Sequence, residues 1–224
     1  MRRISIARSL GTLLAMNLSA VALTACGGGG SSTSASLPAG CQEVPKPRPK
    51  RVNLEPPTSR VAAHTKLEAD VSTSCGNFTI ALDSAAWPKT VGSFVHLSRQ
   101  GVYDDASFQR IVPGFVIQGG DPSGTGMGGP GYTVTERPPP GTQYTHGTVA
   151  MAKTAVAPPG QSGSQFFVVI AADAGLPPNY ALVGRVSSGW GAVNRIATLG
   201  DPESGDAGTP RATVAIRKVT VRPG

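Results

Sequence analysis

Short apolar runs separated by turn-forming residues fill the chain from position 61 onward, which is the pattern of a mainly β domain. The stretch 61–82 carries β-branched residues on both sides of a turn sequence at 75–77 and predicts a hairpin. In 107–121, two short apolar runs meet at Pro113-Gly114, so we expect two strands joined by a tight turn. Further short strands are predicted at 148–151, 165–170, 181–186 and 211–221.

Helical periodicity occurs twice among these strands. The stretch 87–100 has Pro88 at its first helical position and Gly101 just beyond its end, where a glycine terminates a helix. An apolar stripe begins at Val91 and continues at helical spacing, and a second, shorter helix is predicted at 190–199. Short antiparallel strands with two helices favour a barrel closed by helical caps.

The N-terminal stretch 1–25 has the plan of a signal peptide, with arginines first and an apolar run after them. It is too short and too abruptly ended for a membrane-spanning helix with a stop-transfer flank. Its last residues, with Cys26, resemble the bacterial lipoprotein box, which implies that Cys26 is lipidated, with acyl chains such as palmitate in a lipid bilayer. Each buried CH₂ group of an acyl chain adds about 0.8 kcal/mol to membrane binding. The alternative is ordinary cleavage that leaves Cys26 unmodified.

The stretch 26–60 is rich in Gly and Ser and then in Pro, and it has few large apolar residues. A Gly/Ser segment behaves as a flexible coil, and a Pro-rich segment as a stiffer extended spacer. We therefore expect three parts: a lipoprotein signal peptide at 1–25, a tether at 26–60 and a folded domain at 61–224.

The distribution of charge argues against nucleic-acid binding. The 224 residues carry a formal net charge of +7, but much of the excess lies in the leader and the tether. From position 61 onward, 12 Lys and Arg stand against 11 Asp and Glu. A nearly neutral domain has no basic face to hold phosphates.

The cysteines and histidines give a disulfide candidate and no metal site. If Cys26 is lipidated, Cys41 and Cys75 are the only pair for a disulfide in an oxidising compartment, and a free structural pair is the alternative. Such a bridge would add about 2–4 kcal/mol of stability. The chain has no Cys-x-x-Cys motif, and its three histidines are far apart, so we expect no metal ligands.

Two stretches partly match known motifs, one for dinucleotide binding and one for a serine nucleophile, but neither has the surrounding sequence that the motif requires. The stretch 124–129 matches G-x-G-x-x-G, but Pro130-Gly131 follows instead of the helix that would supply a phosphate site. The serines in 160–164 lack the last glycine of a nucleophile elbow. We therefore expect neither a cofactor nor a covalent nucleophile.

The stretch 108–121 resembles the signature strand pair of the cyclophilin family of peptidyl-prolyl cis-trans isomerases. Met151-Ala152, the stretch 163–167, Leu176 with Tyr180, and Val183-Gly184 then follow in the order of that family. The resemblance extends from about position 65 to 221. It implies a mainly β fold, an eight-stranded closed antiparallel barrel capped by two helices.

Carried over residue by residue, the resemblance implies that Arg110 is the catalytic residue. The residues that it places around a substrate proline or along the peptide groove are Phe115, Val116, Gln118, Ala152, Gln165, Phe167, Leu176 and Tyr180. The chain departs from the family at Gln109, where many members have His, and at Lys153, where an asparagine is usual. Without its motif, Arg110 would be interpreted as a surface ion pair with a nearby aspartate.

The predicted activity is isomerisation of X-Pro bonds in exported proteins that are folding. We expect a monomer that is exported and lipid-anchored to the outer face of the cytoplasmic membrane or to the periplasmic side. The alternative is a proline-peptide-binding module at the cell surface with little or no catalysis.

Overall fold

The computed structural model describes residues 36–58, 61–62 and 65–224. The predictions on the signal peptide and on lipidation of Cys26 lie outside these residues. Within the described ranges, no helix is long and apolar enough to cross a membrane.

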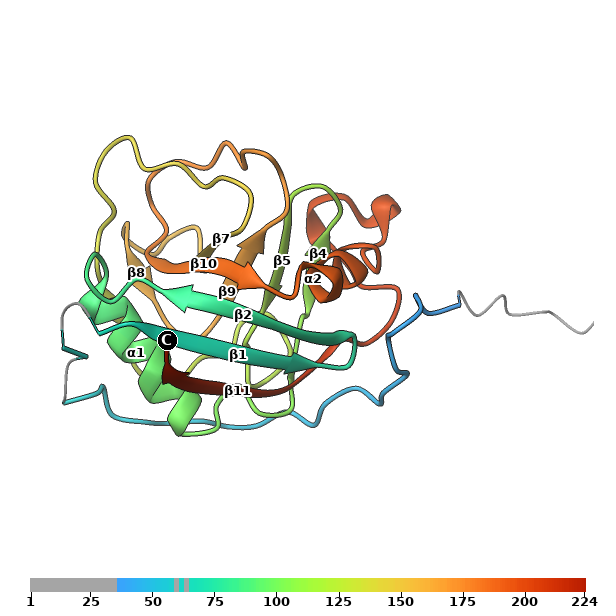
Figure 1. Ribbon diagram of the computed structural model, residues 1–224, viewed down its shortest axis with the longest axis horizontal. Helices are drawn as coiled ribbons and strands as arrows, with labels where there is room; N and C mark the ends of the chain where they lie inside the picture. The colour runs from blue at the N-terminus through green and yellow to red at the C-terminus, as the bar shows by residue number, and fades with distance from the viewer. Residues whose placement is uncertain (1–35, 59–60, 63–64) are drawn as a thin grey trace, which may run out of the picture. The chain divides into compact units, whose positions relative to one another are not determined.

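A curled antiparallel sheet of nine strands dominates the domain, in the order β3-β11-β1-β2-β10-β7-β9-β5-β4 (Figure 1). A second, two-stranded sheet pairs β6 with β8. The strands of the large sheet are β1 (Leu67–Thr73), β2 (Gly76–Leu82), β3 (Ala106–Ser107), β4 (Arg110–Val112), β5 (Val116–Gly119), β7 (Thr148–Met151), β9 (Phe166–Val169), β10 (Leu182–Ser188) and β11 (Ala215–Pro223). Those of the small sheet are β6 (Val134–Thr135) and β8 (Gln161–Ser162).

The expected closed barrel of eight strands is not confirmed, and the reason lies between β3 and β4. Ser107 at the end of β3 pairs with Ala215 of β11, whereas Arg110 at the start of β4 pairs with Gln118 of β5. The chain thus changes partner across two residues that belong to neither strand. Among the described residues, no strand pairing joins β3 to β4, so the sheet order has two ends.

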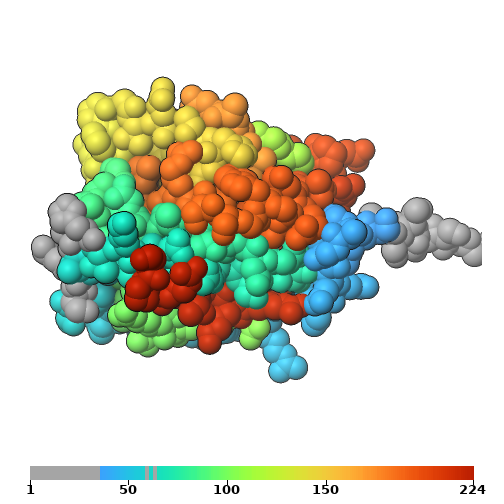
Figure 2. Space-filling view, in the orientation of Figure 1, coloured from blue at the N-terminus to red at the C-terminus, as the bar shows by residue number. Residues whose placement is uncertain are grey.

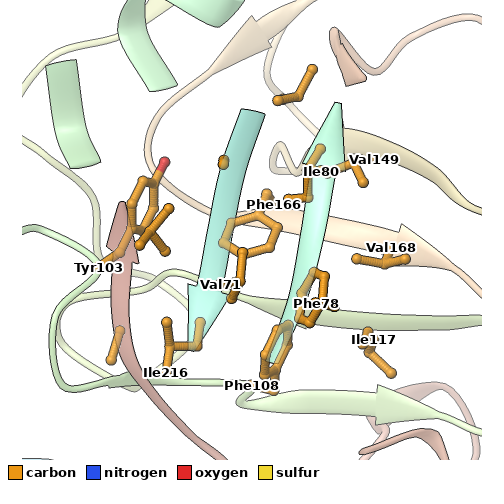
Figure 3. Close-up of a cluster of buried hydrophobic side chains, with 14 of the residues drawn as sticks. Val71, Phe78, Ile80, Tyr103, Phe108, Ile117, Val149, Phe166, Val168 and Ile216 are labelled. Carbon is orange, nitrogen blue, oxygen red and sulfur yellow. The ribbon is translucent and has the colours of Figure 1, made fainter. Parts of the chain in front are cut away.

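The main core lies between the sheet and α1 (Pro88–Arg99), and aromatic rings fill its centre (Figure 3). Phe166 packs edge-to-face against Phe94 and Tyr103, with ring centroids 5.7 and 5.6 Å apart. The hydroxyl of Tyr103 lies in this apolar interior, and burial raises its pKa far above the ordinary value. A smaller apolar cluster on the other face of β9 includes Phe167.

Helix α1 begins and ends as its sequence predicts. Pro88 occupies its first turn, and the carboxylate of Glu136 accepts hydrogen bonds from the backbone N–H groups of Lys89 and Thr90 at 3.2 and 2.8 Å. A negative charge at a helix N-terminus is favourable because it meets unpaired N–H groups and the positive end of the dipole. Gly101, with φ of +66°, follows the C-terminal end of the helix.

The second helix, α2 (Trp190–Ala197), follows Gly189, which has φ of +81°. A Cβ atom at this position would lie 2.4 Å from the backbone oxygen of Asn77, so the close approach to β2 requires glycine. The sequence predicted α2 but not the 3₁₀ helix η1 (Pro202–Ala207) that follows it.

Residues 36–58, which we call the strap, lie on the surface of the domain instead of forming an unattached spacer (Figures 1 and 2). The half-buried positions first recur every third residue, at Cys41, Val44, Pro47 and Lys50. This is the period of a polyproline II segment lying with one edge against a surface. A disulfide joins Cys41 to Cys75 between β1 and β2, so the strap is also held covalently. Composition indicated an extended chain but not that the domain would offer a surface for it.

Candidate active site

The site is built on the antiparallel pair of β4 and β5. Arg110 stands opposite Gln118 across the pair, so their side chains share one face of the sheet. Ile111 and Ile117 pair next to them, point to the other face and are fully buried. The alternation of the two strands therefore fixes the arginine on the groove side while its neighbours anchor the strands in the core.

The Arg110 guanidinium is held by neutral groups. Its Nε donates to the backbone oxygen of Asp206 at 3.0 Å, and its Nη1 donates to Oε1 of Gln118 at 3.5 Å. Its Cζ lies 6.0 Å from the centroid of the Phe115 ring. Among the described residues, ion pairs are formed by Arg222 with Glu68 and Asp70, and Arg110 forms none. The surface ion pair with a nearby aspartate is therefore not the arrangement found.

An apolar cluster lies beside Arg110 and contains most of the residues predicted for the proline pocket. Val116 and Phe167 are buried, and the partly buried side chains packed on them are Phe115, Ala152, Leu176 and Tyr180. The rings of Phe167 and Tyr180 meet edge-to-face, with centroids 5.5 Å apart. The structure thus brings all eight residues predicted for the proline pocket and groove to one side of β5, β7 and β9 or to the loops next to them.

Tyr144, which the sequence did not single out, is a fully buried member of this cluster. Its hydroxyl donates to the backbone oxygen of Tyr180 at 2.7 Å and accepts from the N–H of Tyr180 at 2.9 Å. Burial raises the pKa of Tyr144, although the hydrogen bond to Tyr180 opposes the effect. The contact joins residues 36 positions apart, so no local pattern could have indicated it.

A chain of side-chain amides connects the arginine to residues 122–130, which we call the glycine-rich loop. Nε2 groups of both Gln118 and Gln109 donate to Oε1 of Gln165, at 3.0 and 2.9 Å. Nε2 of Gln165 then donates to the backbone oxygens of Gly126 and Gly128, each at 3.0 Å. Gln165 is therefore fixed from both sides, and the position of the loop determines the position of the amides beside Arg110.

The glycine-rich loop is itself organised around Asp121, whose side chain is buried. Its carboxylate accepts hydrogen bonds from the backbone N–H groups of Ser123, Gly126 and Gly128 at 2.7, 2.6 and 3.1 Å. Burial acts to raise the pKa of Asp121, but the hydrogen bonds from Ser123, Gly128 and Gly126 together lower it below the ordinary value of an aspartate. The glycine-rich loop is therefore held together by hydrogen bonds to a carboxylate and not by packing of apolar side chains.

A cleft of about 900 Å³ continues from the amide groups of Gln118 and Gln165. The glycine-rich loop forms one side of it, and the loop of residues 153–162 forms another. Lys153 donates from Nζ to the backbone oxygen of Ala157 at 2.8 Å and lies 5.8 Å from the Tyr180 ring centroid. The described part of the chain has no group of three His, Cys, Asp or Glu side chains that could hold a metal ion.

The arrangement combines a fixed cation, an apolar cluster with partly exposed side chains and a row of amides. Arginine keeps its proton throughout the physiological pH range, so Arg110 can donate hydrogen bonds but cannot act as a base. The partly exposed apolar side chains can contact a small apolar ring, and the amides can hydrogen-bond an extended backbone next to it. Such a site is suited to binding and polarising a peptide.

Comparisons with known proteins match the chain to one family. The sequence model of the family described as "Cyclophilin type peptidyl-prolyl cis-trans isomerase/CLD" matches residues 68–221. The chain is 37% identical over 155 residues to peptidyl-prolyl cis-trans isomerase-like 1 of Gibberella zeae, covering 67% of this chain and 92% of that protein. It is 33% identical over 192 residues to the probable peptidyl-prolyl cis-trans isomerase B of Mycobacterium leprae, covering 79% of this chain and 61% of that one.

A solved structure is similar to this chain in fold. A cyclophilin-type isomerase of Cryptosporidium parvum, crystallised in the presence of the dipeptide Ala-Pro, superposes with a TM-score of 0.63 at 27% identity. The match covers 70% of this chain and 99% of that chain.

Proposed function

The chain belongs to the cyclophilin-type peptidyl-prolyl cis-trans isomerase family, and from this premise we propose that Arg110 stabilises the twisted X-Pro amide of exported proteins while they fold. The observation that carries the proposal is the position of Arg110, which lies beside the Phe115 ring and is bonded to neutral acceptors only.

The reaction needs no nucleophile and no proton transfer. Rotation about an X-Pro bond has a barrier of about 20 kcal/mol because the amide is conjugated, and it takes tens of seconds without a catalyst. A catalyst must bind the twisted amide more tightly than either planar isomer. In the twisted state the proline nitrogen becomes pyramidal and regains its lone pair, which a guanidinium N–H can hydrogen-bond.

The contacts of Arg110 support this role because they fix the guanidinium before substrate arrives. Asp206 holds Nε, and Gln118 holds Nη1. The donors therefore need little reorganisation when the lone pair develops, which is the condition for electrostatic stabilisation of a transition state. Each 1.36 kcal/mol of preference for the twisted amide accelerates rotation about tenfold.

The proposed location follows from the N-terminal sequence and the disulfide. The lipoprotein box implies an anchor at Cys26, and the Cys41–Cys75 bridge suits an oxidising compartment outside the cytoplasm. Clients would then be X-Pro segments of proteins that fold after export.

The test compares full-length wild type with Arg110→Ala and Arg110→Lys, using a short peptide with a single X-Pro bond followed by NMR exchange. We expect wild type to accelerate rotation and Arg110→Ala to lower kcat/KM at least about tenfold. Arg110→Lys should restore little, because an ammonium does not reproduce the planar donor geometry. Arg137→Ala, at an exposed arginine, is the matched control and should leave the rate unchanged.

Two results would count against the proposal. A bell-shaped pH profile between pH 6 and 8 would implicate a titrating group, since arginine does not titrate there. A folded wild type that binds X-Pro peptides without accelerating them would favour the peptide-binding module instead.

A further inference from the structure

The strap holds both ends of the glycine-rich loop by backbone hydrogen bonds. The N–H of Lys50 donates to the backbone oxygen of Pro122, and the N–H of Leu54 donates to that of Pro130, each at 2.8 Å. Pro122 and Pro130 are the first and the last residue of the loop. The strap therefore clamps the loop across its whole length.

The strap also lies in close contact with the backbone where the loop ends. Side chains at positions 50–54 alternate between half-buried and exposed, so every second one faces the domain. A Cβ atom on Gly131, the residue after the loop, would lie 2.9 Å from the Cα atom of Asn53 and 3.1 Å from the nitrogen of Leu54. A shift of the strap at this point is therefore passed on to the loop.

Lys50 fixes this part of the strap with its side chain. Its Nζ donates to the backbone oxygens of Gly101 and Val102 at 3.2 and 3.4 Å and also to that of Asp104. An ammonium group has three N–H donors, and each has a carbonyl oxygen here. These carbonyls follow the C-terminal end of α1, where the helix dipole favours a positive charge. Lys50 is thereby an anchor and not a solvated side chain.

Hydrogen bonds continue from the loop to the candidate active site. The backbone oxygens of Gly126 and Gly128 hold Nε2 of Gln165, each at 3.0 Å. Oε1 of Gln165 accepts from Nε2 of Gln118 at 3.0 Å. Oε1 of Gln118 in turn accepts from Nη1 of Arg110 at 3.5 Å. The strap, the loop and the guanidinium are thus joined by consecutive contacts.

We propose that Lys50 is a positioning residue for the isomerase, which acts through the strap and the glycine-rich loop on the amides that hold Arg110. This role rests on the proposed function, because it concerns how the Arg110 guanidinium is fixed. The strap lies outside residues 68–221, the part that matches the family, so this support is an addition to the family fold.

Loss of the Lys50 anchor should affect the transition state more than substrate binding. A loop that is held less firmly leaves Gln165 and Gln118 less well ordered. Arg110 must then be ordered during the reaction, which raises the barrier because preorganised donors are the source of the stabilisation. The apolar side chains that contact the substrate ring are not part of this connection, so KM should change little.

The experiment compares full-length wild type with Lys50→Met, Lys50→Arg and the control Lys46→Met, at an exposed lysine of the same strap. Rotation of one X-Pro peptide is followed by NMR exchange, and thermal unfolding confirms that each variant is folded. Lys50→Met should lower kcat about threefold to tenfold and change KM by less than about twofold. Lys50→Arg should restore most of kcat, because a guanidinium also donates to several carbonyls. Lys46→Met should behave as wild type.

A second pair of variants cuts the strap from the loop without changing Lys50. Leu54→Pro removes the N–H that donates to Pro130, whereas Leu54→Ala keeps it and controls for the loss of the side chain. Proline is compatible with an extended backbone. We expect kcat of Leu54→Pro to be about threefold or more below that of Leu54→Ala. If Lys50→Met does not fold, this pair decides the result.

Two measurements distinguish positioning from a general loss of stability. In a Gln165→Ala background the connection is already cut, so adding Lys50→Met should change kcat by less than about twofold. A general effect would lower kcat by the same factor in both backgrounds. Hydrogen exchange at the backbone N–H groups of Gly126 and Gly128 should be faster in Lys50→Met than in wild type or Lys46→Met.

The outcomes separate this role from the proposed function. Loss of activity in Arg110→Ala with wild-type kcat in Lys50→Met overturns the role of Lys50 and leaves the isomerase mechanism intact. An equal effect of Lys50→Met with and without Gln165 also overturns it. If wild type accelerates no X-Pro peptide, the proposed function fails, and the side-chain N–H signals of Gln165 and Arg110 decide: a shift in Lys50→Met supports the positioning, and unchanged signals overturn it.

Discussion

Phe166 and Phe167 are neighbours on β9, yet they serve opposite faces of the sheet. Phe166 is completely buried and packs edge-to-face against Phe94 and Tyr103 in the main core. Phe167 is 4% exposed and meets the partly buried ring of Tyr180 in the apolar cluster beside Arg110. The residue type, the strand and the degree of burial are nearly the same for both.

The difference lies in the packing around each ring. Helix α1 contributes Phe94 to the face of Phe166, so that every ring in contact with Phe166 is itself buried. On the face of Phe167, partly buried side chains such as Phe115 and Leu176 leave apolar surface in contact with solvent. Apolar side chains therefore form the core on the Phe166 face of β9, and on the Phe167 face they form a partly exposed surface that can bind a ligand. The burial of a single residue does not distinguish a core position from a site position.

Replacing Phe166 should have the largest effect on stability. We expect Phe166→Ala to lower the free energy of unfolding by about 3–5 kcal/mol, because it leaves a cavity among buried rings. Urea unfolding followed by tryptophan fluorescence measures this change. The kcat/KM of the molecules that remain folded should change by no more than about twofold.

If the alanine variant does not fold, Phe166→Leu should still show a stability loss of about 1 kcal/mol without a loss of activity. A large activity loss in a folded Phe166 variant would contradict the division between the two faces.

The same change at Phe167 should affect function more than stability. We expect Phe167→Ala to lower kcat/KM by about tenfold or more, since it removes apolar contact with the substrate ring. The free energy of unfolding should fall by about 2 kcal/mol, less than for Phe166→Ala, because the cavity opens to solvent. Equal stability losses with unchanged kcat/KM would show that Phe167 is core and that the substrate binds elsewhere.

The smallest expected effect is on the pH dependence of the free energy of unfolding. It arises at Asp121 in the glycine-rich loop. The folded-state pKa of Asp121 is lowered from its ordinary value, so its carboxylate stabilises the folded state at higher pH and loses this contribution as the pH falls through the folded-state pKa. Asp121→Asn should lower the free energy of unfolding by about 1–3 kcal/mol at pH 7, because the amide presents a donor to N–H groups.

The difference in unfolding free energy between wild type and Asp121→Asn should be constant above roughly pH 5 and shrink below pH 4. Urea unfolding at a series of pH values measures it. Asp206→Asn, at an exposed aspartate, is the matched control and should show no comparable trend. A difference that grows as the pH falls would mean that the pKa of Asp121 is raised instead.

The sequence predicted those elements whose signals are local. Pro88 and Gly101 mark the two ends of α1, and Pro113-Gly114 marks the turn between β4 and β5. Family resemblance then predicted which residues contact the substrate proline, whereas periodicity alone would assign them to the core. The two-residue strands of the small sheet and η1 were missed because elements so short carry no periodicity. The path of the strap was missed because its position depends on carbonyls of distant segments, such as those that Lys50 contacts.

The Cys41–Cys75 disulfide makes a closed covalent ring of the strap and β1, with a sequence separation of 34. A protease that cuts one peptide bond inside this ring does not separate the two products, since the bridge still joins them. Whatever lies N-terminal to Cys41 stays attached to the isomerase domain until the bridge is also reduced. Release of the domain by a single cut requires that the cut fall before Cys41, so the ring restricts where proteolysis can detach it.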